Sequence, residues 1–448
     1  MTGLTRRAFC RRSALALGGL AVGGSLHALL ARSPDRRLQN AGYGPLAPTP
    51  DVSTGLPLLL LPAGFSYVSF GWTGDPLSDG TPTPGGHDGM GVVRATRRRI
   101  WLTRNHELRG RTSAFGDGTV TYDAEAQGGT TTLVFDRSQR RLVEARVSLA
   151  GTSTNCAGGP TPWRTWLTCE ETVADFTKPH GWVFEVPAVG AASALPLRAM
   201  GRFVHEAAAV DPRTSIVYQT EDSVTAGLYR YVPRLPRRLS EGGRLQMLAV
   251  VGTPQASLHA NVAAGATFPV EWVDVGDPER AHSPGTTDGR GVYRQGHDLG
   301  GATFRRLEGA WYARGRIFFV STNGGNAGQG QVWEYDPRRE VLRLRYESPA
   351  ADVLDNPDNI AAGPRGSLLL CEDGDSPGLR LRVLTRTGEI FPLAENNVVL
   401  NGERNGIAGD FRGAEWAGAT FHGRWLFVNI QTPGITFAIT GPWRRAAL

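Results

Sequence analysis

Apolar residues recur along the chain in short runs that alternate with polar positions and end before turn-forming residues. Many of these runs carry an aromatic or aliphatic pair, and several are followed by Asp-Pro or Val-Pro. Alternation with a period of two, bounded by Gly and Pro, is typical of β-strands. Clear examples lie at 133–136, 182–187, 228–233, 332–337, 381–384 and 436–439.

The spacing of these runs indicates a repeat. They follow one another about every 45–55 residues, with one gap of about twice that length between Tyr231 and Val332. Periods of this size, each holding several short strands, are typical of β-propellers. The pattern therefore predicts an all-β fold, a six-bladed β-propeller with an insertion between blades. A different multi-sheet β fold is the alternative.

The same pattern predicts the domain organisation. Residues 58–448 are expected to form a single propeller domain, with the insertion at about 234–305. Residues 34–57 are rich in Pro, Ser and Gly and are expected to be a linker or an extended arm. The chain holds 58 Gly and 29 Pro, which suits many short strands joined by turns.

Residues 1–33 have the features of a twin-arginine signal peptide. Arg6 and Arg7 are followed two residues later by Phe9, and a mildly apolar run covers 13–30. This run is rich in Gly and less hydrophobic than a membrane-spanning helix requires. We therefore predict export by the Tat translocase to the periplasm or the cell exterior. A retained membrane anchor is the alternative.

The charge of the chain does not favour nucleic acid as a partner. The formal net charge is +6, but residues 1–33 hold five arginines and no acidic residue. The remainder is close to neutral, so it lacks the basic excess of a nucleic-acid-binding domain. We expect a monomer that acts on small molecules.

The segment 152–171 concentrates groups that can carry chemistry. It contains Asn155, Cys156, Cys169, Glu170 and Glu171 around a Gly- and Pro-rich turn. An apolar strand that ends in a thiol and two carboxylates predicts a metal or catalytic site. A hairpin with a buried thiol and solvated acids is the alternative, and Cys156, on the turn side, is expected to be structural.

Acidic or amide side chains recur beside an apolar strand in nearly every period. In a propeller, equivalent positions of different blades meet at the channel, and pooled carboxylates need cations to remain ionised. Oxygen donors favour Ca²⁺, Mg²⁺ or Mn²⁺, and a thiolate among them favours iron or zinc. Such a centre beside Arg306 suits hydrolysis of phosphate esters. The candidates include Glu107, Asn155, Cys169, Glu170, Glu206, Glu308, Asn359 and Glu415.

Several motifs together resemble the PhoX family of alkaline phosphatases, and the resemblance runs from about residue 60 to the C-terminus. The twin-arginine start is shared, and the two longest motifs are specific to the family. The motifs are NHE at 105–107, GTSTNCAGGPTPWRTWLTCEE at 151–171, GRFVHEAAAVDP at 201–212, TED at 220–222, RLEG at 306–309, PDNI at 357–360 and EWAGATF at 415–421.

The resemblance implies a phosphomonoesterase that is exported in the folded state with Ca²⁺ and Fe³⁺ at one mouth of a six-bladed propeller. It implies Cys169 as the iron ligand, Arg306 as the group that holds the substrate phosphate, and Arg306, Cys169 and Glu308 as the catalytic set. A further Asp ligand is expected between Glu206 and Glu308, with Asp222, Asp288 and Asp298 as candidates. The implied metal ligands are Glu107, Asn155, Cys169, Glu170, Glu206, Glu308, Asn359 and Glu415.

Two other functions are compatible with a metal-binding propeller. One is a calcium-dependent lactonase or esterase, which would use a histidine at the mouth; His87, His106 and His205 are available. The other is a non-catalytic propeller that metals only stabilise.

Overall fold

The computed structural model of the protein describes residues 42–116, 118–446 and 448, and strands provide most of the regular structure there. The expected signal peptide, 1–33, lies outside the described residues. None of the helices in the described part combines the length and the apolar character that crossing a membrane requires.

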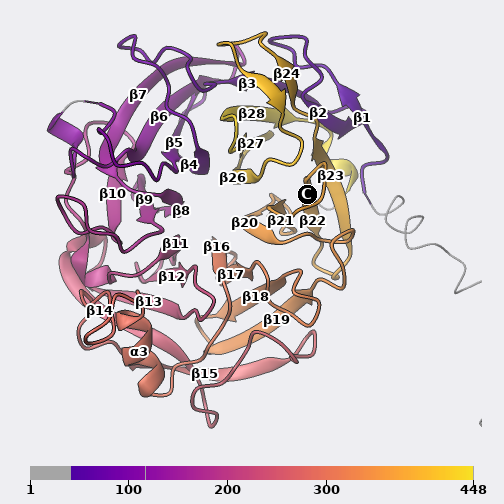
Figure 1. The fold of residues 1–448 in the computed structure, drawn as a ribbon. Helices are drawn as coiled ribbons and strands as arrows, with labels where there is room; N and C mark the ends of the chain where they lie inside the picture. The colour runs from indigo at the N-terminus through magenta and orange to yellow at the C-terminus, as the bar shows by residue number, and fades with distance from the viewer. Residues whose placement is uncertain (1–41, 117, 447) are drawn as a thin grey trace, which may run out of the picture.

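The strands of the described residues form six blades around a central channel (Figure 1). The innermost strands, β4, β8, β11, β16, β20 and β26, each pack against the innermost strands of the two neighbouring blades. The six-bladed propeller predicted from the repeat is therefore confirmed. Blade 1 consists of β4 (His87–Ala95), β5 (Arg99–His106), β6 (Gly128–Asp136) and β7 (Arg141–Thr152), and blade 2 of β8 (Asn155–Pro160), β9 (Thr165–Glu170) and β10 (Val183–Pro187). Blade 3 consists of β11 (His205–Val210), β12 (Val217–Glu221), β13 (Leu228–Leu235) and β14 (Arg238–Val250), and blade 4 of β16 (Leu307–Ala313), β17 (Arg316–Ser321), β18 (Gln331–Asp336) and β19 (Val341–Glu347). Blade 5 consists of β20 (Pro357–Ala362), β21 (Leu368–Glu372), β22 (Arg380–Leu384) and β23 (Ile390–Asn396), and blade 6 of β26 (Trp416–His422), β27 (Trp425–Ile430), β28 (Ile435–Thr440) and β3 (Ser66–Phe70).

The repeated apolar runs of the sequence are the third strands of the blades. They correspond to β6, β10, β13, β18, β22 and β28. In five of the six blades the third strand pairs with a strand on each edge; β10 of blade 2 ends its sheet. A neighbouring blade packs on each face of these strands. Both faces are therefore buried, which explains why these strands are the most apolar of each period.

The ring closes through a strand from the start of the described chain. β3 pairs antiparallel with β28, with Phe70 opposite Thr436 and Ser66 opposite Thr440. Ahead of it, β1 (Leu46–Thr49) and β2 (Leu59–Pro62) form an antiparallel pair that joins the edge of blade 5 through β23. The expected arm before residue 58 is thus an ordered extension of the propeller from residue 42 onward.

The insertion is shorter than predicted. Residues 238–250 were expected to belong to it, but they form β14, the fourth strand of blade 3. The start of β14 is polar and exposed, so its sequence lacks the alternation of a typical strand. The additional structure begins after Val250 and contains β15 (Thr267–Asp274) and α3 (Gly291–Asp298). β15 pairs with both β14 and β19 and so joins blades 3 and 4 into one sheet.

Small residues allow the innermost strands to approach closely. A Cβ on Gly89 would lie 2.6 Å from the Cα of Ala157 in blade 2, and a Cβ on Gly309 would lie 2.8 Å from the Cα of Asn359 in blade 5. Distances below 3.0 Å are too short for non-bonded carbon atoms. The channel is therefore narrow at this level, and side chains from different blades come together there.

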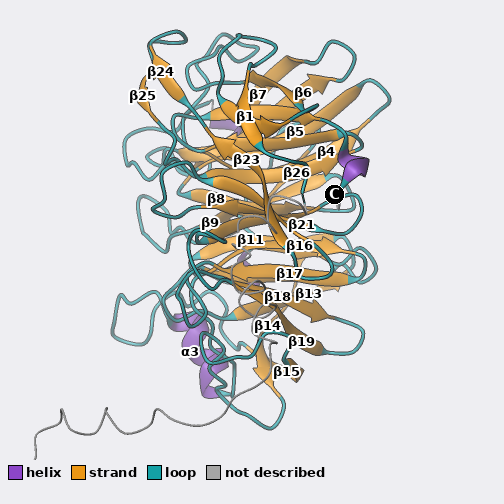
Figure 2. Ribbon diagram, turned by 90° about the vertical axis from the view of Figure 1, so that its right-hand side faces the viewer, coloured by secondary structure: helices purple, strands orange, loops and turns teal. Residues whose placement is uncertain are grey.

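The two faces of the propeller receive different parts of each blade. Every innermost strand begins at one mouth of the channel, and the second strand returns to that mouth. The turns between the first and second strands therefore lie on the opposite face. Figure 2 shows α3 and the hairpin of β24 (Val399–Asn401) and β25 (Ala408–Asp410) on the mouth side, with the C-terminus on the opposite side.

Candidate metal centre

The second residues of the six innermost strands occupy equivalent positions and form one ring around the channel. In blades 1 to 5 this residue is an acid or a thiol, and in blade 6 it is Ala417. Because the blades repeat around the channel, these positions are equivalent and converge at the mouth. The residues are Asp88, Cys156, Glu206, Glu308 and Asp358, all of them buried.

A second ring of positions follows the second strand of each blade. The backbone N–H of each residue there donates to the carbonyl of the residue just before the innermost strand, as Glu107 does to Gly86 at 2.8 Å and Glu171 does to Thr154 at 2.9 Å. Four of the six carry carboxylates. The residues are Glu107, Glu171, Asp222, Thr322, Asp373 and Gln431.

Irregular strand pairing places the first ring. In blades 1 to 5 the register between the first two strands shifts at the second and third residues of the innermost strand. Such β-bulges leave a residue unpaired and redirect its side chain, and they are common beside active sites. The repeated bulge explains how five blades direct equivalent side chains to one centre.

The five residues of the first ring and two of the second, Glu107 and Glu171, form one continuous cluster. Potential ligand atoms lie within 4.8 Å of one another in three overlapping triads, which share Cys156 and Glu206. We call this set the acidic cluster. The triads are Asp88–Glu107–Cys156, Cys156–Glu171–Glu206 and Glu206–Glu308–Asp358.

The carboxylates of the cluster lack the partners that buried charges need. Both oxygens of Glu206, one of Asp88 and one of Asp358 have no hydrogen-bond partner in the described structure. Burial, followed by the neighbouring carboxylates, raises the pKa of each of these groups well above its usual range. Uncompensated buried carboxylates are costly unless they are protonated or bind cations. The donor set therefore fits metal ions, with oxygen ligands for hard cations and one thiol for a softer metal.

The outer side of the cluster is less buried and titrates differently. Burial and the adjacent Asp222 raise the pKa of Glu171 to about 9. Burial raises the pKa of Asp373 to about 6, against the lowering effect of Arg306. Burial, Asp358 and Asp88 raise the pKa of Glu415, which places that carboxyl in the field of the cluster.

Two arginines flank the cluster at the mouth. Arg306 forms a two-point ion pair with Asp222, at 2.8 and 2.9 Å, and its Nη2 lies 2.9 Å from Glu308 Oε1. Arg109 contacts Glu107 at 2.6 Å and Glu171 at 3.5 Å. The side chain of Arg306 is 39% exposed and that of Arg109 is 72% exposed, so both guanidinium groups are accessible to an anion that enters the mouth.

The structure does not bring Cys169 to the cluster. Cys169 lies on β9 opposite Val183 and packs in an apolar core with Leu167 and Phe203. The thiol in the cluster belongs to Cys156, whose pKa is raised by burial and by Asp88. The assignment of Cys169 as ligand and catalytic group is corrected accordingly: it occupies a strand position that faces the blade interior.

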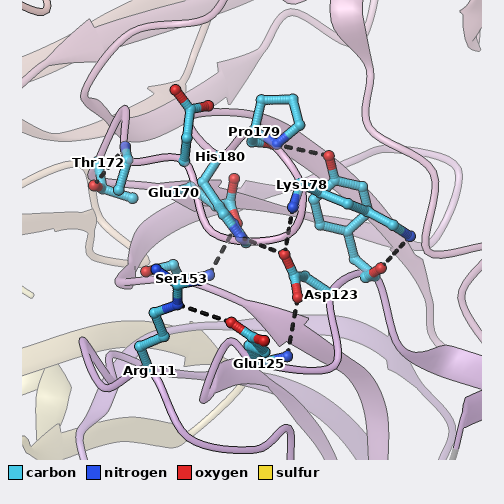
Figure 3. Close-up of polar contacts among 12 residues, drawn as sticks. Arg111, Asp123, Glu125, Ser153, Glu170, Thr172, Lys178, Pro179 and His180 are labelled. Carbon is cyan, nitrogen blue, oxygen red and sulfur yellow. Dashed lines mark hydrogen bonds and ion pairs between the residues drawn. The ribbon is translucent and has the colours of Figure 1, made fainter. Parts of the chain in front are cut away.

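Glu170 is also committed elsewhere, as Figure 3 shows. Its carboxylate accepts hydrogen bonds from the backbone N–H groups of Ser153 (2.9 Å), Gly181 (2.8 Å) and Trp182 (3.0 Å) and contacts His180 Nδ1 at 2.6 Å. His180 Nε2 lies 3.6 Å from Asp123. A carboxylate with four partners positions loops, and the adjacent Glu171 takes the place predicted for Glu170.

Neither of the two predicted amide ligands, Asn155 and Asn359, belongs to the acidic cluster. Asn155 accepts a hydrogen bond from Thr152 at 2.6 Å and donates one to Thr168 at 2.9 Å, so its side chain is bonded within the sheet. Asn359 follows Asp358 in the bulge of blade 5, and it is the carboxylate of Asp358 that joins the triad. The predicted residues that the structure does gather are Glu107, Glu206, Glu308 and Arg306, with Glu415 beside them.

The sequence search missed Asp88, Cys156, Glu171, Asp358 and Asp373 and left Asp222 as one candidate of three. The signal that identifies Asp88, Cys156 and Asp358 is positional: each is the second residue of an innermost strand, as Glu206 and Glu308 are. Asp222 is the acid that meets Arg306, whereas Asp288 bonds only within its own loop.

The histidines that a lactonase would need belong to none of the groups of potential metal ligands among the described residues. Rings of His87, His106 and His205 are buried and bond to the backbone carbonyls of Pro84, Gly85 and Gly201 at 2.9 to 3.0 Å. Burial lowers the pKa of each of them. Their role in this structure is to connect loops and strands.

Comparison with known proteins identifies the same family as the sequence motifs. The family model described as alkaline phosphatase PhoX matches residues 41–148 and 142–434. Among solved structures, Pseudomonas fluorescens PhoX in complex with vanadate, a transition state analogue, superposes with a TM-score of 0.64 at 17% identity, covering 90% of this chain and 98% of that one. The WD40 β-propeller domain of Doa1 gives 0.40 at 9% identity over 85% and 100% of the two chains. No curated protein sequence matches significantly.

Fold and site together define a β-propeller enzyme built around an acidic centre whose donor groups fit metal ions. The chain belongs to the alkaline phosphatase PhoX family, which the family model matches over most of its length, and it is a phosphatase of that family. The resemblance recognised from the motifs is confirmed.

Replacing Glu206 by Gln should change how calcium affects stability. Without metal, Glu206→Gln removes an acidic group from a crowded buried cluster; if the cluster binds calcium, the substitution also removes a ligand. The increase in the free energy of unfolding on adding Ca²⁺ should therefore shrink by about 1 kcal/mol or more in Glu206→Gln. Denaturant unfolding with and without Ca²⁺ measures this.

Glu221→Gln is the matched control. Glu221 is equally buried, but its carboxylate accepts hydrogen bonds from Gly227 N–H and the Tyr229 hydroxyl. The increase in the free energy of unfolding of Glu221→Gln on adding Ca²⁺ should equal that of the wild type. Equal increases in the two variants would contradict the assignment of Glu206 as a ligand.

Proposed function

We propose that the protein hydrolyses phosphate monoesters at the mouth of the propeller, where the acidic cluster holds calcium and iron. The observation that carries this proposal is the set of buried carboxylate oxygens without hydrogen-bond partners, flanked by two accessible arginines. Cations would coordinate the unpartnered carboxylate oxygens, and a phosphate group would bind both to these cations and to the two arginines.

The donor types divide the cluster between hard and softer metals. The carboxylates of Glu206, Glu308 and Asp358 form a triad of oxygen donors, which suits Ca²⁺. Cys156 belongs to two triads, one with Asp88 and Glu107 and one with Glu171 and Glu206. A thiolate beside carboxylates suits Fe³⁺, so Cys156 is the proposed iron ligand in place of Cys169.

Arg306 is held ready for a phosphate group. Its backbone lies in the left-handed region, with φ of 43°, and its guanidinium is fixed by Asp222 on one side and Glu308 on the other. A guanidinium fixed in this way loses little freedom on binding a tetrahedral anion. Arg109, between Glu107 and Glu171, provides a second positive charge on the other side of the mouth.

When bound, the cations would neutralise the cluster, polarise the phosphate oxygens and make a nucleophilic oxygen available near neutral pH. The residues of the chain orient the substrate: Arg306 and Arg109 donate hydrogen bonds to non-bridging phosphate oxygens and stabilise the charge that develops on them. The buried walls exclude bulk water from the cluster, which strengthens these interactions.

Export is part of the proposal. The twin-arginine pattern in 1–33 supports transport by the Tat translocase, which moves folded proteins, to the periplasm or the cell exterior. A centre assembled from five blades requires a complete fold before metals bind, which suits this route. We propose a monomer that acts on soluble phosphate esters.

Removing metals should abolish hydrolysis. Dialysis of the purified protein against a chelator should bring the hydrolysis of p-nitrophenyl phosphate to background, and Ca²⁺ should restore it, because the cluster cannot bind phosphate while it is uncompensated. Unfolding measured in the same samples shows whether the fold persists. Full activity in chelated, folded protein would overturn the proposal.

Cys156 and Cys169 should differ in their effect on bound iron. Cys156→Ser should lower the iron content of protein purified without added metals, because it removes the thiol of the cluster. Cys169→Ser should keep the iron, although a hydroxyl in an apolar core lowers stability by about 1–3 kcal/mol. Elemental analysis of the two proteins decides between them, and iron lost only from Cys169→Ser would reverse the assignment.

Arg306→Ala should lower kcat/KM by roughly 10²–10³-fold, because it removes a preorganised donor to the phosphate. Arg306→Lys keeps the charge but not the two-point geometry and should fall between alanine and wild type. The neighbouring Arg305 is exposed and serves as the control, since Arg305→Ala should retain wild-type kinetics. Equal losses at both positions would argue against a specific role for Arg306.

A further inference from the structure

Each blade carries an arginine on the face opposite the acidic cluster. The turns between the first and second strands all lie on that face, and every one of the six has an exposed arginine at or beside the turn. We call these six residues the arginine ring. They are Arg97, Arg164, Arg213, Arg314, Arg365 and Arg424.

Most of the arginine ring has no compensating charge. Arg213 pairs with Asp211 at 3.1 Å. Among the described residues, no carboxylate forms an ion pair with Arg164, Arg314, Arg365 or Arg424. The mouth shows the opposite arrangement, since Arg109 and Arg306 are both paired with acids.

The outer turns of the same face extend the positive surface. The turns between third and fourth strands expose Arg237, Arg338, Arg339 and Arg386, and the segment after β28 exposes Arg444 and Arg445. The exposed carboxylates in these turns are Glu340 and Glu389. A near-neutral domain that separates its charge in this way presents one strongly basic face.

A cavity of about 880 Å³ opens on this face beside the C-terminus. Four arginines line it, Arg365, Arg424, Arg444 and Arg445, together with the buried side chains of Trp443 and Leu448. Basic groups around an apolar floor suit a ligand that joins an anionic head to an apolar stem. A phospholipid headgroup with the first part of its acyl chains has this chemistry.

The chain enters the described fold at the same face. The hydroxyl of Tyr43 donates to the carbonyl of Trp443 at 2.9 Å, and its ring packs edge-on against Phe65 and Trp443. The apolar run 13–30 precedes this point in sequence. Residues 31–42 span at most about 40 Å when extended, so a membrane that held the apolar run would lie within about that distance of Tyr43, and the arginine ring is on the face where Tyr43 packs.

We infer that the arginine ring and the cavity beside it form a surface that docks on membranes containing anionic phospholipids. Each arginine close to an anionic surface adds to the attraction, and the sum is lost as salt screens it. In the docked orientation the mouth faces the solution, where soluble phosphate esters have access to the acidic cluster.

The test is co-sedimentation of the full chain with vesicles. One set contains phosphatidylglycerol mixed with phosphatidylcholine, and the other contains phosphatidylcholine alone, which reports binding through the apolar run. The triple variant Arg164→Gln/Arg314→Gln/Arg424→Gln should bind the anionic vesicles roughly 100-fold more weakly than wild type at low salt. Its binding to neutral vesicles and its hydrolysis of a soluble ester should be unchanged.

A control variant carries the same change in charge away from this face. Arg244, Arg280 and Arg294 are exposed and lie on outer strands and the insertion, and their replacement by Gln should leave vesicle binding within about twofold of wild type. Equal losses in both triple variants, or binding that ignores lipid charge, would overturn the proposal. Binding to heparin that needs the arginine ring, without binding to anionic vesicles, would also overturn it in favour of a soluble polyanion.

Discussion

The repulsion among buried carboxylates at the channel mouth is the constraint on which the rest of the structure depends. Glu206, Glu308 and Asp358 come from three different blades, yet their oxygens lie within 4.8 Å of one another. A rigid framework holds the carboxylates at this distance, and protonation or cations must offset their repulsion. The close contacts at Gly89 and Gly309, the repeated bulges and the two paired arginines all serve this one requirement. The fold and the site therefore depend on each other, because blades distant in sequence hold the carboxylates of one cluster together.

The sequence pattern was sufficient for the architecture because the third strands are buried on both faces and repeat at a regular spacing. It failed for β14, whose exposed, polar beginning has no strand signature and was included in the insertion. In the site, Glu107, Glu206 and Glu308 were found because each carboxylate adjoins an apolar strand. The roles of Cys156 and Cys169 were interchanged because both cysteines lie in one hairpin, and the sequence does not show that Cys156 is on the innermost strand β8 whereas Cys169 is on the second strand β9. The pairing register, which cannot be read from the sequence, leaves Cys156 in the bulge of β8 and places Cys169 opposite Val183.

Glu170 illustrates why a correct motif can still mislead at the level of single residues. Glu170 ends β9 and Glu171 follows it, and alternation directs the two side chains to different surroundings. Glu170 binds three backbone N–H groups and His180, which fixes the loop after β9, and Glu171 reaches the cluster. Residues that support a site are as closely tied to a family motif as the ligands themselves, so recognition of the motif alone does not separate the two roles.

The pairing of β3 with β28 has a consequence for the order in which the protein is made. β3 is synthesised before the other strands of the blades and can pair with β28 only after β28 has been made, so the ring closes at the end of synthesis. Blade 6 also supplies Gln431, which donates to Glu107 at 2.6 Å across the joint. The acidic cluster therefore takes its final form only after synthesis of β28, and a nascent chain or a C-terminally shortened product lacks the blade that closes the ring around it. Completion of the ring thus restricts the finished cluster to molecules that contain the last blade.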